Sequence, residues 1–174
     1  FSGFGGQGAL FAGQLLAYSG MAEDLHVTWI PSYGPEMRGG TANCTVIVSE
    51  MEIGAPIIRH PTAAVVLNLP SMEKYEPLVK PGGVLVVNTS LVDIESERDD
   101  IRVIALPASD IAEELGNARM ANVVALGALI EATGLVDFET VEQQLEEHLS
   151  ARQREWLGPN KKALHKGAER AKSE

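Results

Sequence analysis

The sequence predicts an α/β fold with three layers, in which a mainly parallel, mixed sheet lies between helices. Strand-like and helix-like stretches alternate along the chain, which is typical of a parallel sheet with helical connections. A glycine-rich turn at residues 3–8 leads directly into an apolar, helix-favouring run, as in a Rossmann-like fold. Residues 63–67 are apolar throughout, as expected of a strand in a sheet that is covered on both faces.

The first helix is expected at residues 9–21, directly after the glycine turn. A short buried strand follows at 27–30 and ends at Pro31. Residues 41–49 alternate and are rich in β-branched side chains, so they form the clearest strand of the chain. Only a loop of about ten residues precedes this strand, which is too short for a crossover helix. The strand is therefore expected to run antiparallel or to lie at an edge of the sheet.

The second half of the chain carries the longest helix candidate, at residues 118–132, which is apolar on most of its surface and ends at Thr133-Gly134. Ser109 or Asp110 can cap a helix that begins near Ile111. The remaining elements are strands at 63–67, 84–87 and 101–106, helices at 72–78 and 138–149, and a basic helix after a break at 156–159.

The chain of 174 residues, 45% of them hydrophobic, is long enough for one domain core. We assign residues 1–150 to the α/β domain and residues 151–174 to a basic helical tail. The first segment carries 7 basic and 21 acidic side chains, and the second carries 7 basic and 3 acidic ones. The tail is either a solvated helix that offsets part of the acidic charge or a docking segment for another subunit.

Composition argues against several classes of function. The net charge of −10 is unlike that of a general nucleic-acid binder. No apolar run reaches the ~18 residues of a membrane span, and no signal peptide is visible. The one cysteine, Cys44, cannot by itself form a disulfide, an iron–sulfur cluster or a structural zinc site, and we expect it to be a small core residue. A reducing, cytoplasmic setting fits this composition.

The glycine turn reads Gly3-x-Gly5-x-x-Gly8, which matches the dinucleotide-binding fingerprint. Glycines let a ligand phosphate approach the backbone, and the helix that follows directs free N–H groups at it. The alternative is a turn that only packs a strand against a helix. The second strand ends without the acidic residue of a nicotinamide site, which argues against an NAD-dependent dehydrogenase. We expect most of the strand that feeds the turn to be missing from the sequence, which opens on the turn.

Ligands bind past the carboxyl ends of the strands in a parallel sheet. The loops there supply N–H groups, amides and hydroxyls, together with Tyr33, Glu36 and Arg38. No Gly-x-Ser-x-Gly motif and no Cys–His pair is indicated, so we predict a binding surface with no catalytic residues and no metal ligands of its own. The loops expected to meet at this edge are 3–8, 32–40, 68–71 and 88–90.

Some of these residues also have purely structural interpretations. Glu36 and Arg38 could form an ion pair that only fixes the shape of their loop. Arg119 and Asn122, at the start of the longest helix, could be functional or could satisfy buried carbonyl groups. The sequence leaves both choices open.

Several longer motifs closely resemble the gamma subunit, or gamma domain, of 2-oxoacid:ferredoxin oxidoreductases of the pyruvate, 2-oxoglutarate and 2-ketoisovalerate type. The likeness extends from Phe1 to about Leu149 and does not cover the tail. The motif that begins at Pro31 is the most specific, because it is long and unusual. The motifs are Gly3-Phe-Gly-Gly-Gln-Gly8, Pro31-Ser-Tyr-Gly-Pro-Glu-Met-Arg-Gly-Gly-Thr-Ala-Asn-Cys44, Asn68-Leu-Pro-Ser71, Tyr75-Glu-Pro-Leu-Val-Lys-Pro-Gly-Gly83 and Asn117-Ala-Arg-Met-Ala-Asn122.

This resemblance implies a multi-subunit enzyme that decarboxylates a 2-oxoacid with thiamine diphosphate, passes electrons through [4Fe-4S] clusters to ferredoxin and releases an acyl-CoA. Alpha and beta subunits would hold the thiamine diphosphate, and cysteine-rich parts the clusters, with a delta or ferredoxin-like subunit as a further candidate partner. The lack of cluster cysteines in this chain fits that division. The chain itself would pack against the catalytic subunits and help to bind coenzyme A, and it would meet ferredoxin only indirectly.

The resemblance also implies roles for individual residues. Gly5, Gly6 and Gly8 would approach a phosphate of coenzyme A. An indolepyruvate-type beta subunit shares this fold and remains an alternative, as does a stand-alone nucleotide-binding or regulatory module. The candidates for coenzyme A binding are Gly3, Gly5, Gly6, Gln7, Gly8, Asn68 and Asn88. The candidates for the subunit junction near the active site are Ser32, Tyr33, Gly34, Pro35, Glu36, Arg38, Gly39, Gly40, Arg119 and Asn122.

Overall fold

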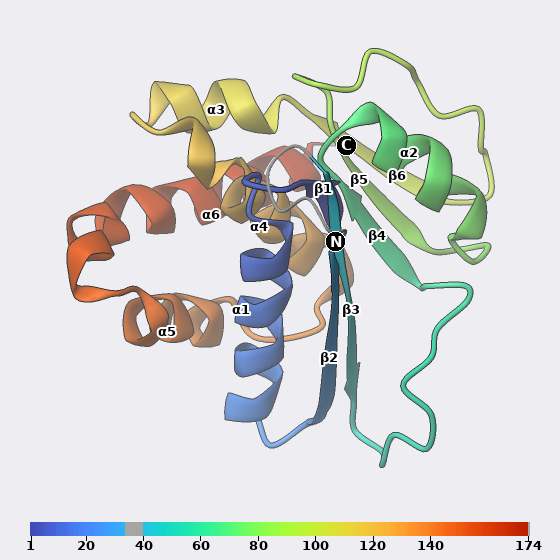
Figure 1. The fold of residues 1–174 in the computed structure, drawn as a ribbon, viewed down its shortest axis with the longest axis horizontal. Helices are drawn as coiled ribbons and strands as arrows, with labels where there is room; N and C mark the ends of the chain where they lie inside the picture. The colour runs from blue at the N-terminus through green and yellow to red at the C-terminus, as the bar shows by residue number, and fades with distance from the viewer. Residues whose placement is uncertain (34–39, 174) are drawn as a thin grey trace.

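Six strands form one mixed sheet in the order β2-β3-β1-β4-β5-β6 (Figure 1). The structure is a computed structural model that describes residues 1–33 and 40–173. For Tyr33 and Arg152 it describes the backbone only. β4, β5 and β6 run parallel to β1, whereas β3 is antiparallel to both β1 and β2. The predicted α/β fold with a mainly parallel, mixed sheet is confirmed. The strands are β1 (Ser2–Phe4), β2 (His26–Tyr33), β3 (Thr41–Ser49), β4 (Ala63–Val66), β5 (Val84–Asn88) and β6 (Arg102–Leu106).

Helices cover both faces of this sheet, so the molecule has three layers (Figure 1). α1, α4, α5 and α6 lie on one face and α2 on the other, while α3 lies near the carboxyl edge of the parallel strands. None of the described helices is both long and apolar enough to cross a membrane. The helices are α1 (Ala9–Ala22), α2 (Leu69–Tyr75), α3 (Ala108–Glu114), α4 (Ala121–Thr133), α5 (Phe138–His148) and α6 (Leu157–Lys172), with 3-10 turns at Glu76–Leu78, Ala118–Met120 and Ala151–Trp156.

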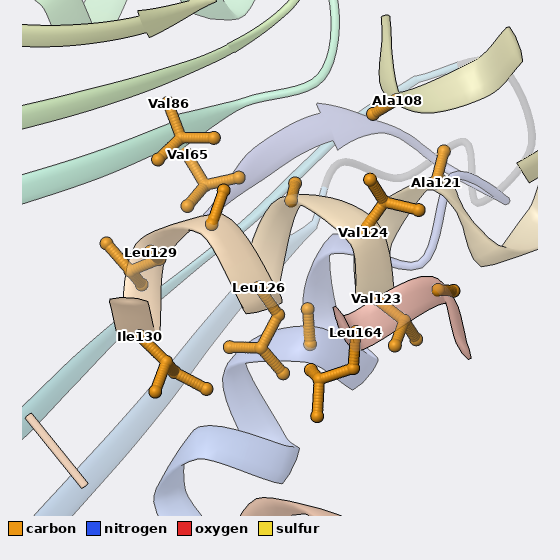
Figure 2. Close-up of a cluster of buried hydrophobic side chains, with 14 of the residues drawn as sticks. Val65, Val86, Ala108, Ala121, Val123, Val124, Leu126, Leu129, Ile130 and Leu164 are labelled. Carbon is orange, nitrogen blue, oxygen red and sulfur yellow. The ribbon is translucent and has the colours of Figure 1, made fainter. Parts of the chain in front are cut away.

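The larger core surrounds α4, whose first ten residues, 121–130, are all buried. Figure 2 shows α4 between Val65 and Val86 of the sheet and Leu164 of α6. The next residues along the same strands, Val66 and Val87, face the smaller core under α2. This alternation follows from the two-residue period of a strand. It explains why the central strands are apolar throughout, as the sequence predicted.

The second strand is longer than predicted, because β2 continues through Pro31 to Tyr33. Pro31 lies opposite Cys44 of β3. The backbone N–H of Cys44 points away from β2 and donates to the Phe1 carbonyl (2.9 Å). The pair Pro31–Cys44 is therefore not hydrogen-bonded, and the missing N–H of proline points out of the edge of the sheet. Proline does not end this strand, because β2 is an edge strand.

Three other expected elements have different outcomes. The expectation for β3, antiparallel or at an edge, is confirmed by its antiparallel pairing with β1 and β2, and the edge position belongs to β2. α3 begins at Ala108 after Pro107, and the N–H groups of Ser109 and Asp110 donate to Asn88 Oδ1 (3.2 Å) and Ser90 Oγ (3.2 Å), so neither Ser109 nor Asp110 acts as its cap. The strand that leads into the glycine turn is β1, whose three residues pair with β3 on one side and with β4 on the other.

The last helix shares the core of the preceding domain. Ala163 and Leu164 of α6 are fully buried in the same cluster as α4, so α6 is not a solvated helix. Its basic face also meets acidic residues, since Lys161 lies 3.4 Å from Glu146 and Lys172 lies 3.5 Å from Glu131. The helix begins at Leu157, inside the stretch that the sequence predicted as a break. The boundary placed at residue 150 stays a prediction.

Two glycines let α4 and α6 approach closely. A methyl group at Gly167 would overlap the Val124 carbonyl oxygen, and one at Gly127 would overlap the Leu164 carbonyl oxygen. We expect Gly167→Ala to lower the free energy of unfolding by about 2–3 kcal/mol, because the backbones must move apart. Gly54→Ala is the matched control, since nothing lies within 4 Å of the added methyl and the φ angle is not positive. Urea denaturation of both variants checks this, and equal stability would contradict the close packing.

Candidate functional site

The carboxyl ends of β1, β4, β5 and β6 bring four loops to one edge of the sheet. Parallel strands end at the same edge, so this convergence follows from the topology. Gly40 also lies at this edge, because the Gly5 N–H donates to the Gly40 carbonyl (2.8 Å). We call this region the carboxyl-edge site. Its loops are residues 5–8, 67–68, 88–90 and 107–109, together with the flanking residues Tyr33 and Gly40.

Gln7 connects the glycine turn to the loop after β4. Its Oε1 accepts hydrogen bonds from the Phe4 N–H (2.5 Å) and from Asn68 Nδ2 (3.1 Å). Its Nε2 donates to the Leu67 carbonyl (3.2 Å). A side chain at Gly3 would come within 2.6 Å of Gln7 Oε1. Gly3 is therefore explained by the packing of Gln7, without a ligand.

Asn68 and Asn88 continue this network across the next two strands. Asn68 accepts from the Ser71 N–H (3.0 Å) and so caps α2. Asn88 donates to the Leu67 carbonyl (3.3 Å) and to Ser109 Oγ (3.0 Å), and it accepts from the Ser109 N–H (3.2 Å). Both asparagines are buried. Their amides hold the loops in place, so we assign them a positioning role.

The sequence predicted Ser109 only as a possible helix cap, and its place in the carboxyl-edge site was missed. The available signal was its place in the chain, because Ser109 follows β6 just as Asn68 follows β4 and Asn88 ends β5. A second missed contact joins Ser2 of β1 to Ser71 of α2, whose hydroxyl oxygens are 2.9 Å apart. Both serines are buried. These hydroxyls extend the same network to both sides of the sheet.

Asn122 fixes the end of the glycine turn. Its Nδ2 donates to the half-buried Gly8 carbonyl (3.0 Å), which is a structural contact of the kind that the sequence left open as one of two roles. Its Oδ1 is buried and has no partner among the described residues. Gly8 has a φ of +79°, and a side chain there would overlap the Asn122 amide. Arg119, by contrast, is exposed, and its backbone N–H donates to Asn117 Oδ1 (3.1 Å).

Among Gly3, Gly6 and Gly8, only Gly6 faces open space. It has a φ of +101°, and no atom lies within 4 Å of the place where a side chain would begin. The helix α1 begins directly after Gly8, which provides no side-chain cap. Its first helical hydrogen bond is donated by the Ala12 N–H to the Gly8 carbonyl (3.0 Å). The N–H groups of residues 9–11 therefore have no partner within the helix, and they form a patch suited to an anion.

Cys44 is part of the core. It is 4% exposed, and its Sγ lies 3.5 Å from the Ala9 carbonyl oxygen. Burial raises the pKa of the Cys44 thiol, which keeps it protonated and unreactive at neutral pH. Within residues 1–33 and 40–173, no group of three or more His, Cys, Asp or Glu side chains is arranged to hold a metal ion.

The predicted junction residues are only partly covered by the structure. Ser32 is exposed near the end of β2, and Tyr33 is placed by its backbone opposite Ala42 of β3. Gly34, Pro35, Glu36, Arg38 and Gly39 lie outside the described residues, so their roles, including the ion pair between Glu36 and Arg38, stay predictions.

A family model described as pyruvate ferredoxin/flavodoxin oxidoreductase matches residues 1–170. Among curated proteins, the ketoisovalerate oxidoreductase subunit VorA of Methanothermobacter marburgensis is 40% identical over 129 residues, which are 74% of this chain and 27% of that protein. The chain thus spans about a quarter of the length of that relative.

Two solved structures resemble this chain over nearly its whole length. The gamma subunit of a keto/oxoacid ferredoxin oxidoreductase from Geobacter sulfurreducens matches with a TM-score of 0.84 and 31% identity, over 100% of this chain and 97% of that chain. The 2-oxoglutarate:ferredoxin oxidoreductase of Magnetococcus marinus, described with 2-oxoglutarate, coenzyme A and succinyl-CoA bound, matches with a TM-score of 0.89 and 26% identity, over 99% of this chain and 30% of that chain.

The contact between Gly8 and Asn122 can be tested with two alanine variants. Gly6 and Gly8 both have positive φ angles, so alanine strains the backbone at either position by about 1–2 kcal/mol. Gly8→Ala also collides with Asn122, which we expect to add about 1–3 kcal/mol to its loss of stability.

In the double variant Gly8→Ala with Asn122→Ala, that additional loss should shrink, because the colliding amide has been removed. Chemical denaturation of the three variants measures these differences. Equal stability of the two single variants would show that Asn122 does not restrict Gly8.

Proposed function

Because this chain belongs to the pyruvate ferredoxin/flavodoxin oxidoreductase family, we propose that it is the gamma-type part of a multi-subunit 2-oxoacid:ferredoxin oxidoreductase. In this proposal the complex decarboxylates a 2-oxoacid, passes the electrons to ferredoxin and releases an acyl-CoA. The match to the Geobacter gamma subunit over nearly the full length of both chains supports this role. We also infer a cytoplasmic location.

The proposed partners are alpha and beta subunits that carry thiamine diphosphate, with [4Fe-4S] clusters in cysteine-rich parts of the complex. The chemistry of this chain supports that division. Its one cysteine is buried, and the carboxyl-edge site offers amides, hydroxyls and backbone N–H groups. Such groups bind and orient a ligand, whereas decarboxylation and electron transfer need cofactors that they cannot replace.

We propose that the carboxyl-edge site helps to bind coenzyme A through one of its phosphates. The observation that supports this most directly is the open space at Gly6 beside the free N–H groups at the start of α1. The related Magnetococcus enzyme is described with coenzyme A bound. Bound there, coenzyme A would supply the thiol that accepts the acyl group, and this chain would hold its phosphate part.

A dinucleotide fits the site less well. In the common dinucleotide-binding fold, the strand next to β1 ends in an acidic residue that binds the ribose. Here the parallel neighbour of β1 is β4, which leads into Leu67 and Asn68. The Asn68 side chain is already engaged with Gln7 and with the backbone of Ser71. The proposed phosphate-binding turn therefore lacks a neighbouring ribose-binding acid.

Copurification of the native chain from its source tests the subunit assignment. We expect partners that contain thiamine diphosphate and iron–sulfur clusters, and 2-oxoacid oxidation that depends on ferredoxin and coenzyme A. Assays with pyruvate, 2-oxoglutarate, 2-ketoisovalerate and indolepyruvate would identify the substrate and separate the indolepyruvate alternative. Elution of the chain alone, without such partners, would contradict the assignment.

Gly6→Ala tests the coenzyme A proposal in the assembled complex. The added methyl group points into the space that we assign to the phosphate. We expect the KM for coenzyme A to rise about tenfold, which corresponds to about 1.4 kcal/mol of binding energy, while the KM for the oxoacid stays unchanged. Gly54→Ala is the control outside the site. An unchanged coenzyme A requirement, in a complex of normal stoichiometry, would show that the turn is only structural.

A further inference from the structure

The two faces of β2 and β3 differ in their cover. α1 lies on one face, where a methyl group at Gly13 would meet the Cys44 side chain of β3 and one at Gly20 would meet the Val27 side chain of β2. Figure 1 shows α1 along these two strands, with no described helix on their other face. In the second helical layer, α2 packs over β4 and β5 through Met72. One half of the sheet is therefore covered on one side only.

We call the uncovered side of these strands the open sheet face. Side chains alternate along a strand, so this face carries the even-numbered residues of 28–32 in β2 and the odd-numbered residues of 41–49 in β3. Phe4 of β1 extends it, because the Ser2 hydroxyl, two residues earlier, contacts Ser71 of α2 on the same side. None of the residues of this face is buried. Phe4 and Ile30 are 38% and 41% exposed.

The open sheet face carries no charge. None of its residues is Asp, Glu, Lys or Arg, although the chain has 14 basic and 24 acidic side chains. Ile30 lies opposite Thr45, and Thr28 lies opposite Ile47, so isoleucine and threonine form its centre. Exposed apolar side chains without neighbouring charges are typical of the core of a protein interface. The face is therefore suited to an uncharged protein surface.

The dimensions of the open sheet face match one α-helix. Neighbouring strands lie about 4.8 Å apart, so β2, β3 and β1 form a strip about 10 Å wide, which is the diameter of a helix with its side chains. The eight residues of β2 span about 27 Å, the length of a helix of about 18 residues. A helix in this place would mirror α1 and complete the second helical layer over this half of the sheet.

We propose that one helix of another subunit of the same enzyme packs on the open sheet face, with an uncharged side toward Ile30, Thr45 and Ile47. This inference rests on the proposed subunit role. The face ends at Ser32 and Thr41, next to the carboxyl-edge site. A subunit that supplies the helix therefore also reaches that site.

A second copy of this chain fits the face less well. Side chains on one face of a strand are about 6.8 Å apart, so the open sheet face covers about 300 Å². A twofold contact through it would bury about 600 Å² in total, which is below the ~1,200 Å² of a stable interface. Two copies, each with a net charge of −10, would also repel one another. A helix that belongs to a larger subunit avoids this shortage of area, because other contacts of that subunit add to the interface.

Thiol labelling of the assembled enzyme tests the contact. The native Cys44 is buried, so it gives little background. Ile30→Cys places a thiol on the open sheet face. Ile94→Cys is the matched control, because Ile94 is 44% exposed in the loop after β5. We expect a maleimide to label Ile30→Cys at least about tenfold more slowly in the complex than in the isolated chain, and to label Ile94→Cys equally in both.

A photoreactive side chain identifies the occupant. Benzoylphenylalanine in place of Ile30, and separately in place of Ile47, should crosslink within the complex to one other subunit. The captured residues should lie about three, four or seven positions apart in that subunit, because a helix presents such residues on one side.

Each further outcome decides against the inference. Equal labelling of Ile30→Cys in the isolated chain and in an intact complex would overturn it and leave the subunit assignment standing. Crosslinks to a second copy of this chain, or to residues that alternate as in a strand, would overturn it as well. Elution of the chain without partners would overturn both the inference and the assignment on which it rests.

Discussion

The burial of α4 is the constraint on which the rest of the structure depends. Its first ten residues are all buried, so it needs cover on every side. The sheet provides one side and α6 another, and the contact with α6 is close enough to exclude side chains at Gly127 and Gly167. The same helix carries Asn122 at its start, where the amide holds the Gly8 carbonyl. The packing that fixes α4 therefore also fixes the glycine turn.

The carboxyl-edge site is held together by amides that are already occupied. Gln7, Asn68 and Asn88 link the loops after β1, β4 and β5, and each uses both its oxygen and its nitrogen in contacts within the protein. Side chains that are satisfied in this way position a backbone and offer little to a ligand. What remains for binding is mainly the backbone at Gly6 and at the start of α1. In the proposed role, such a surface would recognise an anion by its charge and shape.

Much of this architecture could be predicted because hydrophobic periodicity and glycine turns are local signals. The helix at residues 9–22 and the strands at 63–66 and 84–88 follow from their own sequences. Other features depend on neighbours that are distant in sequence. Pro31 is accepted in β2 because β2 lies at an edge, and Ser109 belongs to the site because Asn88 reaches it. The burial of α6 depends on glycine contacts that its basic composition does not reveal.

The connection after α1 explains why the glycine fingerprint predicts only part of the function. In a dinucleotide-binding unit, the chain returns from this helix to a parallel strand beside the first one, and that strand carries the ribose-binding acid. Here the chain forms the antiparallel pair β2 and β3 instead, which places β3 on one side of β1 and leaves the other side to β4. The turn keeps positive φ angles at Gly6 and Gly8, but the neighbouring position holds an amide that is already engaged. If coenzyme A binds as proposed, its discrimination from other phosphate-bearing ligands must come from groups outside the turn, as expected of a module that completes a site shared with other parts of a larger enzyme.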